Sequence, residues 1–361
     1  MMNRLFATTP DIENCIILLI IGVLFILGLK KKARSRIGGK FLCIDLNMSK
    51  AMKGIACIFI LLGHYGQRKS SLIPEAGLIS KAVWQTTANI GLLWFMFFSG
   101  YGLSLKNMAT SEIFGKWWNR IKKVYLPLLF TSIITTVIYA LLPIKFNATT
   151  AKTLWISDAI VAIHNGDIRG WLPGMFGWLD WYVFCIMIFY TLFYLSYYIM
   201  KKMHWNQTLV LSVMMVGYFV WAYSFFGPSS AHWYRFIWVF LLGHIIARQQ
   251  SEDKSFMILM LLPFIGLILL ESKEMIADYW LGLYGLLIIA ILNRYYQVKK
   301  GSVILFLGNI SYFYYLCHVR IGYQLMTYMG INDLIFWTAF TVGIAWILKS
   351  TYNILPGIKN M

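Results

Sequence analysis

Eleven apolar stretches divide the chain from end to end, and they constrain its fold more than any other feature. Most of them are long enough to cross a hydrocarbon layer about 30 Å thick as a helix, although several are near the lower limit. None shows the alternation of a barrel strand, and a chain in lipid must form its backbone hydrogen bonds within helices or a closed barrel. We therefore predict an all-α fold, a polytopic bundle of about 11 transmembrane helices, at residues 12–29, 51–66, 88–105, 124–143, 179–199, 207–226, 233–247, 256–270, 277–293, 302–327 and 333–350.

The composition agrees with a membrane protein and excludes a soluble basic domain. The 361 residues are 59% hydrophobic and only 13% charged, whereas soluble domains carry about 25% charged residues. The formal net charge of +18 therefore does not indicate nucleic-acid binding. The five cysteines form no C-x-x-C pair, so neither a metal site nor a disulfide framework is predicted.

The distribution of charge between the connections predicts the orientation. Alternate connections together hold 22 of the 32 Lys and Arg residues but only 4 of the 14 acidic residues. By the positive-inside rule these connections face the cytoplasm. They are the segments 30–53, 106–123, 200–206, 248–255, 294–301 and 349–361. We predict a multi-pass protein of the cell (inner) membrane, embedded in the lipid bilayer, with its N-terminus outside and its C-terminus in the cytoplasm.

One predicted helix, within Met48 to Gly66, carries a lysine at its start and a histidine near its end. Lys53 and His64 are eleven residues apart, about three turns, so their side chains share nearly the same face and lie roughly 16 Å apart along the axis. Ionisable groups inside a bilayer are costly and usually face a cavity or a partner. The pair is either functional, or it is a snorkelling lysine and a histidine that hydrogen-bonds a neighbouring helix.

The basic connection 106–123 contains a second candidate site. Arg120 and Lys123 are three residues apart, so they share a face if the helix continues through them. Arginine can bind a phosphate group in bidentate fashion. The segment is either a positive-inside signal alone or a site for a phosphorylated cytoplasmic ligand.

Polar residues also occur inside two later apolar stretches. The sequence FMFFSGYG places Ser99 among small residues that allow close helix packing or the approach of a ligand. The sequence SYFYYLCH places Ser311, Tyr315 and His318 at helical spacing, which indicates either a polar cavity or a hydrogen-bond network between helices. His244, near the inner end of its span, is interpreted as structural.

The predicted outer loop 144–178 contains a third group of polar candidates. His164, Asp167 and Arg169 suit binding of a sugar, since aromatic residues stand close to them in the sequence. Trp181 and Tyr182 follow this loop, and we interpret them as part of the aromatic belt at the membrane interface.

Taken in chain order, five elements resemble the acyltransferase-3 family of integral membrane acyltransferases. The family pattern comprises Arg-x10-His, a phenylalanine-rich stretch ending in Ser-Gly, an R-x-x-R pair, an FLLG element and a late S-Y-x-x-Y-L-x-H element. The matching residues are Lys53 and His64, Phe95 to Gly100, Arg120 and Lys123, Phe240 to Gly243, and Ser311 to His318. The chain departs from the pattern at positions 53 and 123, where lysine keeps the charge of arginine but loses its planar fork.

The resemblance runs from about Met48 to Lys349 and implies a domain organisation. Residues 1–47 are predicted to form an extra N-terminal transmembrane helix with a basic cytoplasmic linker. Residues 48–361 are predicted to form the membrane acyltransferase domain, with the ten helices usual in the family.

The resemblance also implies an activity. An acyl group, usually acetyl, would pass from cytoplasmic acyl-CoA to a hydroxyl of an extracytoplasmic glycan or lipid-linked sugar, without a permanently bound cofactor or metal. Lys53, Arg120 and Lys123 would bind the coenzyme A phosphates. His64 would either accept the proton of the hydroxyl or carry the acyl group as an acyl-imidazole. Ser99, Ser311, Tyr315 and His318, and in the outer loop His164, Asp167 and Arg169, would bind or orient the substrate.

Three other function classes share the apolar spans. A transporter or flippase of lipid-linked sugars, a glycan polymerase or ligase, and a membrane scaffold would each work without acyl-CoA. Other acyl-transfer chemistries have little support, because the chain contains no G-x-S-x-G, H-x-x-x-x-D, H-E-x-x-H or G-K-[ST] motif.

Overall fold

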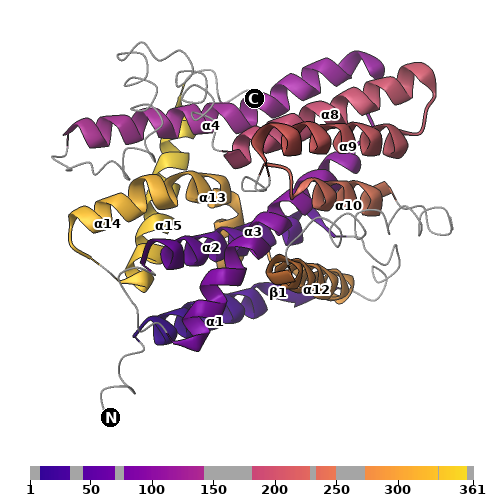
Figure 1. Ribbon diagram of the computed structural model, residues 1–361. Helices are drawn as coiled ribbons and strands as arrows, with labels where there is room; N and C mark the ends of the chain where they lie inside the picture. The colour runs from indigo at the N-terminus through magenta and orange to yellow at the C-terminus, as the bar shows by residue number, and fades with distance from the viewer. Residues whose placement is uncertain are drawn as a thin grey trace.

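The computed structural model describes residues 9–32, 44–69, 77–141, 181–227, 233–248, 273–331 and 333–355. These residues form a bundle of helices in layers (Figure 1). The α-helices are α1 (Thr9–Gly28), α2 (Leu46–Lys69), α3 (Leu78–Ser104), α4 (Ile113–Leu141), α8 (Trp181–Met203), α9 (Gln207–Phe226), α10 (Ile237–Arg248), α12 (Lys273–Tyr295), α13 (Val303–Cys317), α14 (Gln324–Tyr328) and α15 (Leu334–Ile354). The predicted all-α fold is confirmed.

Each predicted span overlaps at least one of these helices, except for 256–270, which lies outside the described residues. One prediction needs refinement, because the stretch 302–327 is not one regular helix. A π-helical turn, η5 (His318–Tyr323), separates α13 from α14. Within the described residues, five helices are long and apolar enough to cross a membrane, which supports a membrane protein. They are Pro10–Gly28, Leu46–Gly66, Trp181–Met203, Gln207–Phe225 and Leu334–Ile354.

Helices α2 and α3 lie at the centre of the bundle, between α1 and the layer that contains α4, α8 and α9 (Figure 1). Small residues let α3 approach its neighbour α10 closely. A Cβ atom at Gly100 would lie 2.1 Å from the carbonyl oxygen of Phe240, and one at Gly243 would lie 2.3 Å from that of Phe97. Each helix therefore places a glycine against the backbone of the other where they cross. Such contacts between small residues are common where membrane helices pack.

Polar residues at the start of α1 attach this helix to the rest of the bundle. The Asp11 carboxylate accepts hydrogen bonds from the backbone N–H of Ser80, at 2.7 Å, and from the Ser80 hydroxyl. Ser80 lies in the first turn of α3, which has no side-chain cap of its own. The Glu13 carboxylate accepts from the backbone N–H of Leu334, the first residue of α15, at 3.3 Å. Acidic side chains of α1 thus satisfy free N–H groups at the starts of two other helices.

We predict that Asp11→Ala loosens the contact between α1 and α3. Loss of an N-terminal cap costs about 1 kcal/mol, so the unfolding midpoint of the purified protein should fall by a few degrees. Ile12→Ala in the same turn is the control, because the Ile12 side chain is exposed. An equal fall in both variants would contradict the capping role of Asp11.

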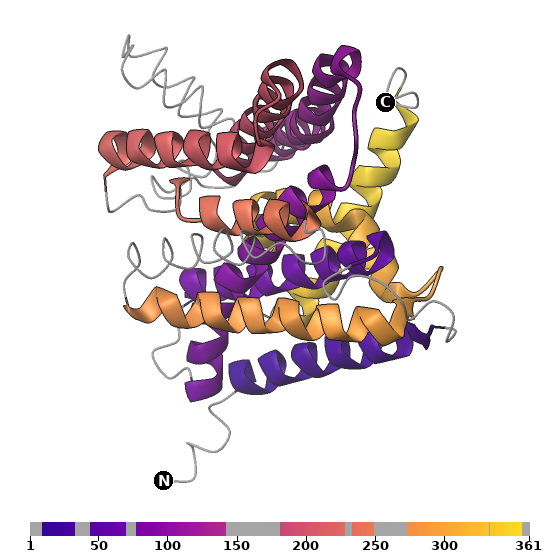
Figure 2. The same ribbon diagram turned by 90° about the vertical axis from the view of Figure 1, so that its right-hand side faces the viewer.

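The structure contains a short β-ribbon that the sequence pattern does not predict. Strand β1 (Leu29–Lys31) pairs antiparallel with β2 (Tyr296–Val298), and Leu29 lies opposite Val298. The ribbon joins the end of α1 to the end of α12, which are drawn in indigo and orange in Figure 2. Three-residue strands are too short to show a periodicity.

Candidate active site

Helices α2 and α13 run parallel and in register, and this register brings two histidines together. Gly54 faces Gly308, since a Cβ atom at Gly54 would lie 2.6 Å from the Gly308 nitrogen. One turn further, the Cys57 thiol donates to the Ser311 carbonyl at 2.8 Å. Each of these pairs is 254 residues apart in the chain, and so are His64 and His318. The His64 and His318 rings lie 5.0 Å apart between centroids.

The π-helical turn that begins at His318 fixes the position of its ring. Nδ1 of His318 lies 2.6 Å from the carbonyl oxygen of Tyr315. The backbone carbonyl of His318 itself accepts from the Trp337 indole at 3.0 Å. Because π-turns shift the backbone hydrogen-bond pattern, carbonyls near them become available to side chains, and such turns are frequent at functional sites. His318 is buried, with 3% of its surface exposed.

Aromatic rings surround the histidine pair. The Tyr315 ring lies 5.8 Å from the His318 ring and 5.1 Å from the Tyr182 ring. The ring of Trp337, whose indole N–H bonds the His318 carbonyl, lies 5.7 Å from the Tyr65 ring. Aromatic rings therefore flank the pair, and Arg320 is close enough for its charge to interact with His318.

Two cations lie together near the first turns of α2. Lys53 on α2 and Arg120 on α4 are both partly buried and close enough for their charges to interact. The Arg120 guanidinium lies 5.1 Å from the centre of the Tyr190 ring, and the Tyr190 hydroxyl donates to Ser99 at 3.5 Å. Nε of Arg120 is buried and has no hydrogen-bond partner among the described residues. An arginine with an unused buried donor next to a second cation suits an anionic ligand.

Further cations extend this group, which we call the cation cluster: Lys50, Lys53, Arg120 and Lys349. Lys50 interacts electrostatically with Lys53 and with Lys349. Within the described part of the chain, both ion pairs lie elsewhere, at Lys32–Asp45 and Lys116–Glu112. Among the described residues the cation cluster therefore has no acidic partner to offset its self-repulsion, and a bound polyanion would relieve that repulsion.

Comparison with known proteins decides the family of this chain. The model of the acyltransferase domain family (Acyl_transf_3) matches residues 46–349. The chain belongs to the acyltransferase-3 family. No curated protein and no solved structure matches it.

Membership makes the chain a membrane acyltransferase. The structure shows where the motifs of this family lie in the fold. The acyltransferase-3 match begins at the start of α2, so α1 lies before it. The first and last motifs of the family meet at the pair of His64 and His318. The Ser-Gly and FLLG motifs pack against each other through Gly100 and Gly243.

The structure does not bring every predicted site residue to these two places. Lys123 is exposed on α4, although Arg120 in the same helix is partly buried. The Ser311 hydroxyl donates to the Gly308 carbonyl at 2.8 Å within its own helix. His164, Asp167 and Arg169 lie outside the described residues. Their assignment to the substrate stays a prediction.

One interpretation of an aromatic residue was wrong. Tyr182 is not part of an interfacial belt, because only 4% of its surface is exposed and its ring packs against Phe95 and Tyr315. Sequence reasoning also missed Cys57, which lies on the same α2 face as the two motif residues, and Tyr190, which stacks under Arg120. Helical spacing reveals Cys57, whereas only tertiary packing reveals Tyr190.

Another buried histidine, His244, has a structural role, as predicted. Nδ1 of His244 lies 2.7 Å from the Ser104 hydroxyl, and Nε2 lies 3.0 Å from the Thr208 hydroxyl. The Ser104 proton is already donated to the Gly100 carbonyl at 2.8 Å. Both ring nitrogens of His244 are therefore satisfied, and this histidine ties α10 to α3 and α9.

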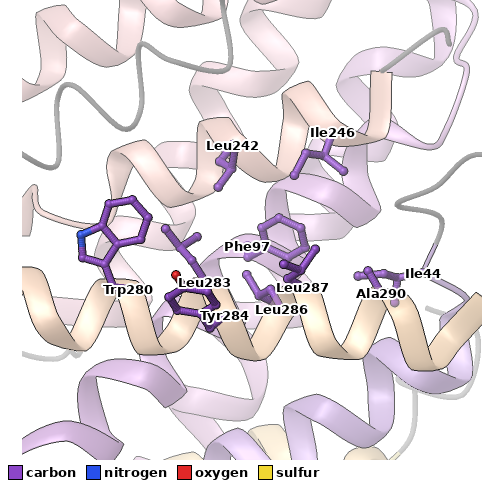
Figure 3. A pocket seen from close by; sticks show the side chains of 10 residues that line it. All are labelled: Ile44, Phe97, Leu242, Ile246, Trp280, Leu283, Tyr284, Leu286, Leu287 and Ala290. Atoms are coloured by element: carbon purple, nitrogen blue, oxygen red, sulfur yellow. The ribbon is translucent and has the colours of Figure 1, made fainter. Parts of the chain in front are cut away.

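The structure also contains a groove elsewhere in the bundle. Its volume is about 240 Å³, and it lies between α12 and the helices α3 and α10 (Figure 3). Its lining is almost entirely apolar and includes neither histidine of the pair nor any member of the cation cluster. The lining residues are Ile44, Phe97, Leu242, Ile246, Trp280, Leu283, Tyr284, Leu286, Leu287 and Ala290.

Proposed function

We propose that this chain transfers an acyl group, in the first instance acetyl, from cytoplasmic acyl-CoA to a hydroxyl of an extracytoplasmic glycan or lipid-linked sugar. One observation carries the proposal. A single helix, α2, contributes Lys53 to the cation cluster and His64 to the histidine pair. The eleven residues between them span roughly 16 Å along the helix, so donor and acceptor groups can approach from opposite sides of the membrane.

The cation cluster supports a phosphorylated donor. Coenzyme A carries a pyrophosphate and a separate phosphate group, and several cations that form no ion pair with a described residue suit such a polyanion. With the phosphates at Lys53 and Arg120, the flexible thiol arm would extend along α2 toward His64. The thioester carbon would then meet the histidine pair, away from bulk water.

Two roles for His64 are compatible with this placement. As a base, a ring nitrogen would take the proton of the acceptor hydroxyl while its oxygen attacks the thioester. As a nucleophile, it would carry the acyl group between two half-reactions. Incubation with donor alone separates these roles, because only the second leaves an acylated enzyme.

We predict that Arg120→Gln weakens donor binding more than it slows the chemical step. The KM for acetyl-CoA should rise about tenfold or more, since a charge-assisted hydrogen bond contributes about 1.5–3 kcal/mol, while kcat changes little. The matched variant Lys106→Gln removes an exposed cation outside the cluster and should leave the KM within about twofold, as expected for a surface position. Equal KM values for both variants would remove Arg120 from the donor site.

The proposed function is tested by the ester-linked acetyl content of cell-surface glycan. A deletion strain would be complemented with the native chain or with empty vector, and purified membranes would be supplied with labelled acetyl-CoA. We expect acetyl ester only where the native chain is present. Unchanged acetylation together with accumulation of a sugar-lipid intermediate in the deletion strain would instead indicate a transporter or polymerase.

A further inference from the structure

We propose that His318 is a catalytic residue, and that its Nε2 atom accepts the proton of the acceptor hydroxyl. The inference rests on the proposed acyl transfer and assigns the proton-accepting step within it. It places the base of the reaction on η5 and leaves His64 to take the acyl group.

The hydrogen bond at Nδ1 determines which ring nitrogen of His318 is basic. The partner of Nδ1 is the backbone carbonyl of Tyr315, at 2.6 Å. A carbonyl oxygen can only accept, so Nδ1 must carry the proton. In the neutral ring the lone pair is then on Nε2. The same contact holds the ring in place, as carbonyl and carboxylate partners do for other catalytic histidines.

Nε2 of His318 is buried and has no hydrogen-bond partner among the described residues. Buried polar atoms are nearly always satisfied, so an unsatisfied one requires an explanation. His244 shows the contrast within the same protein, because hydroxyl groups lie within hydrogen-bond distance of both its nitrogens. The free acceptor of His318 therefore indicates a donor that arrives with the substrate, and a hydroxyl is the donor that this reaction supplies.

The position of His64 completes the division of roles. Its ring lies 5.0 Å from that of His318, so an acyl group on His64 would lie close to the His318 ring. His64 also shares its helix with Lys53 of the cation cluster, on the path of the donor arm. A hydroxyl oxygen within about 2.6–3.2 Å of Nε2 would thus be next to the acyl carbon.

Bonds and protons balance over the two half-reactions. First, a ring nitrogen of His64 attacks the thioester carbon, the carbon–sulfur bond breaks, and the coenzyme A thiolate leaves with the proton that the acyl-imidazolium releases. Second, the acceptor oxygen attacks the acyl carbon while its proton passes to Nε2 of His318. The carbon–nitrogen bond breaks, and the departing His64 nitrogen receives that proton. Both histidines return to their neutral forms.

The experiment uses the full chain in lipid nanodiscs, acetyl-CoA as donor and two nucleophiles. One is surface glycan from the deletion strain, whose hydroxyls need a base. The other is hydroxylamine, which attacks an acyl-imidazole without one. His318→Gln should lower transfer to glycan about 10²- to 10⁴-fold, the usual contribution of a general base, while acetyl hydroxamate forms within about threefold of the native rate. His64→Asn, the comparison variant, should lose both products.

Donor alone provides a second, independent measurement. His318→Gln should release one equivalent of coenzyme A and accumulate an acetyl group on His64, detectable by mass spectrometry, and the native chain should show the same adduct before glycan is added. Three results would overturn the inference: native transfer to glycan by His318→Gln, loss of both products in that variant, or no adduct on the native chain. A native chain that forms neither product would refute the proposed function itself.

Discussion

His64→Asn should reduce acyl transfer to the level of membranes that lack the protein. The substitution removes the imidazole ring that lies 5.0 Å from that of His318, measured between ring centroids, while the smaller asparagine side chain fits the same partly buried position. If His64 were only a base, the loss would be about 10²- to 10⁴-fold. If it carries the acyl group, no step can proceed without it. The measurement is acetyl ester formed per mole of protein from labelled acetyl-CoA.

The matched control for His64→Asn is His204→Asn. His204 is exposed in the turn between α8 and α9, with a positive φ of 57°, and asparagine tolerates that conformation well. This variant should retain native activity. If the two variants had the same activity, His64 would be a packing residue and the mechanism would be wrong.

Gly308→Ala should abolish activity without removing any ionisable group. A Cβ atom at position 308 would lie 2.1 Å from the carbonyl oxygen of Lys50. A backbone carbonyl cannot rotate away from the clash as a side chain can, so α2 and α13 would have to separate. Forced overpacking typically costs about 1–3 kcal/mol, which should lower the unfolding midpoint. Because the same register places His64 opposite His318, acyl transfer should be lost even in the fraction that stays folded.

Gly343→Ala on α15 serves as the control for Gly308→Ala. No atom lies within 4 Å of a Cβ at that position, and alanine favours a helix by about 1 kcal/mol over glycine. The control should therefore be at least as stable as the native chain and fully active. Full activity of Gly308→Ala would show that the contact between α2 and α13 does not set the geometry of the histidine pair.

Local sequence patterns predicted most of the helices and part of the candidate site. Apolar runs located the helices because backbone groups in lipid must bond within their own segment. Helical spacing put Lys53 and His64 on one face of α2, since three turns return a side chain nearly to its starting direction. The family motifs added Arg120 and His318, which local spacing could not join to α2.

Other parts of the structure depend on partners far apart in the chain. Tyr182 was interpreted as an interfacial residue because it follows a predicted loop. The sequence does not show which helix covers its ring. In the fold, the Tyr182 ring packs against Tyr315. The β-ribbon between α1 and α12 was missed because its strands have three residues each. The attachment of α1 through Asp11 was missed because its partner Ser80 is 69 residues away.

The sequence by itself determined a helical membrane protein, the acyltransferase-3 motifs and the face of α2 that carries Lys53 and His64. These follow from short-range rules of hydrophobicity, helical period and motif order. The tertiary structure alone decided that His64 meets His318 and that Tyr315 fixes the proton on Nδ1 of His318. The physical reason is that both results depend on the register between α2 and α13, which is set by contacts such as that of Gly54 with Gly308, and no local pattern encodes that register.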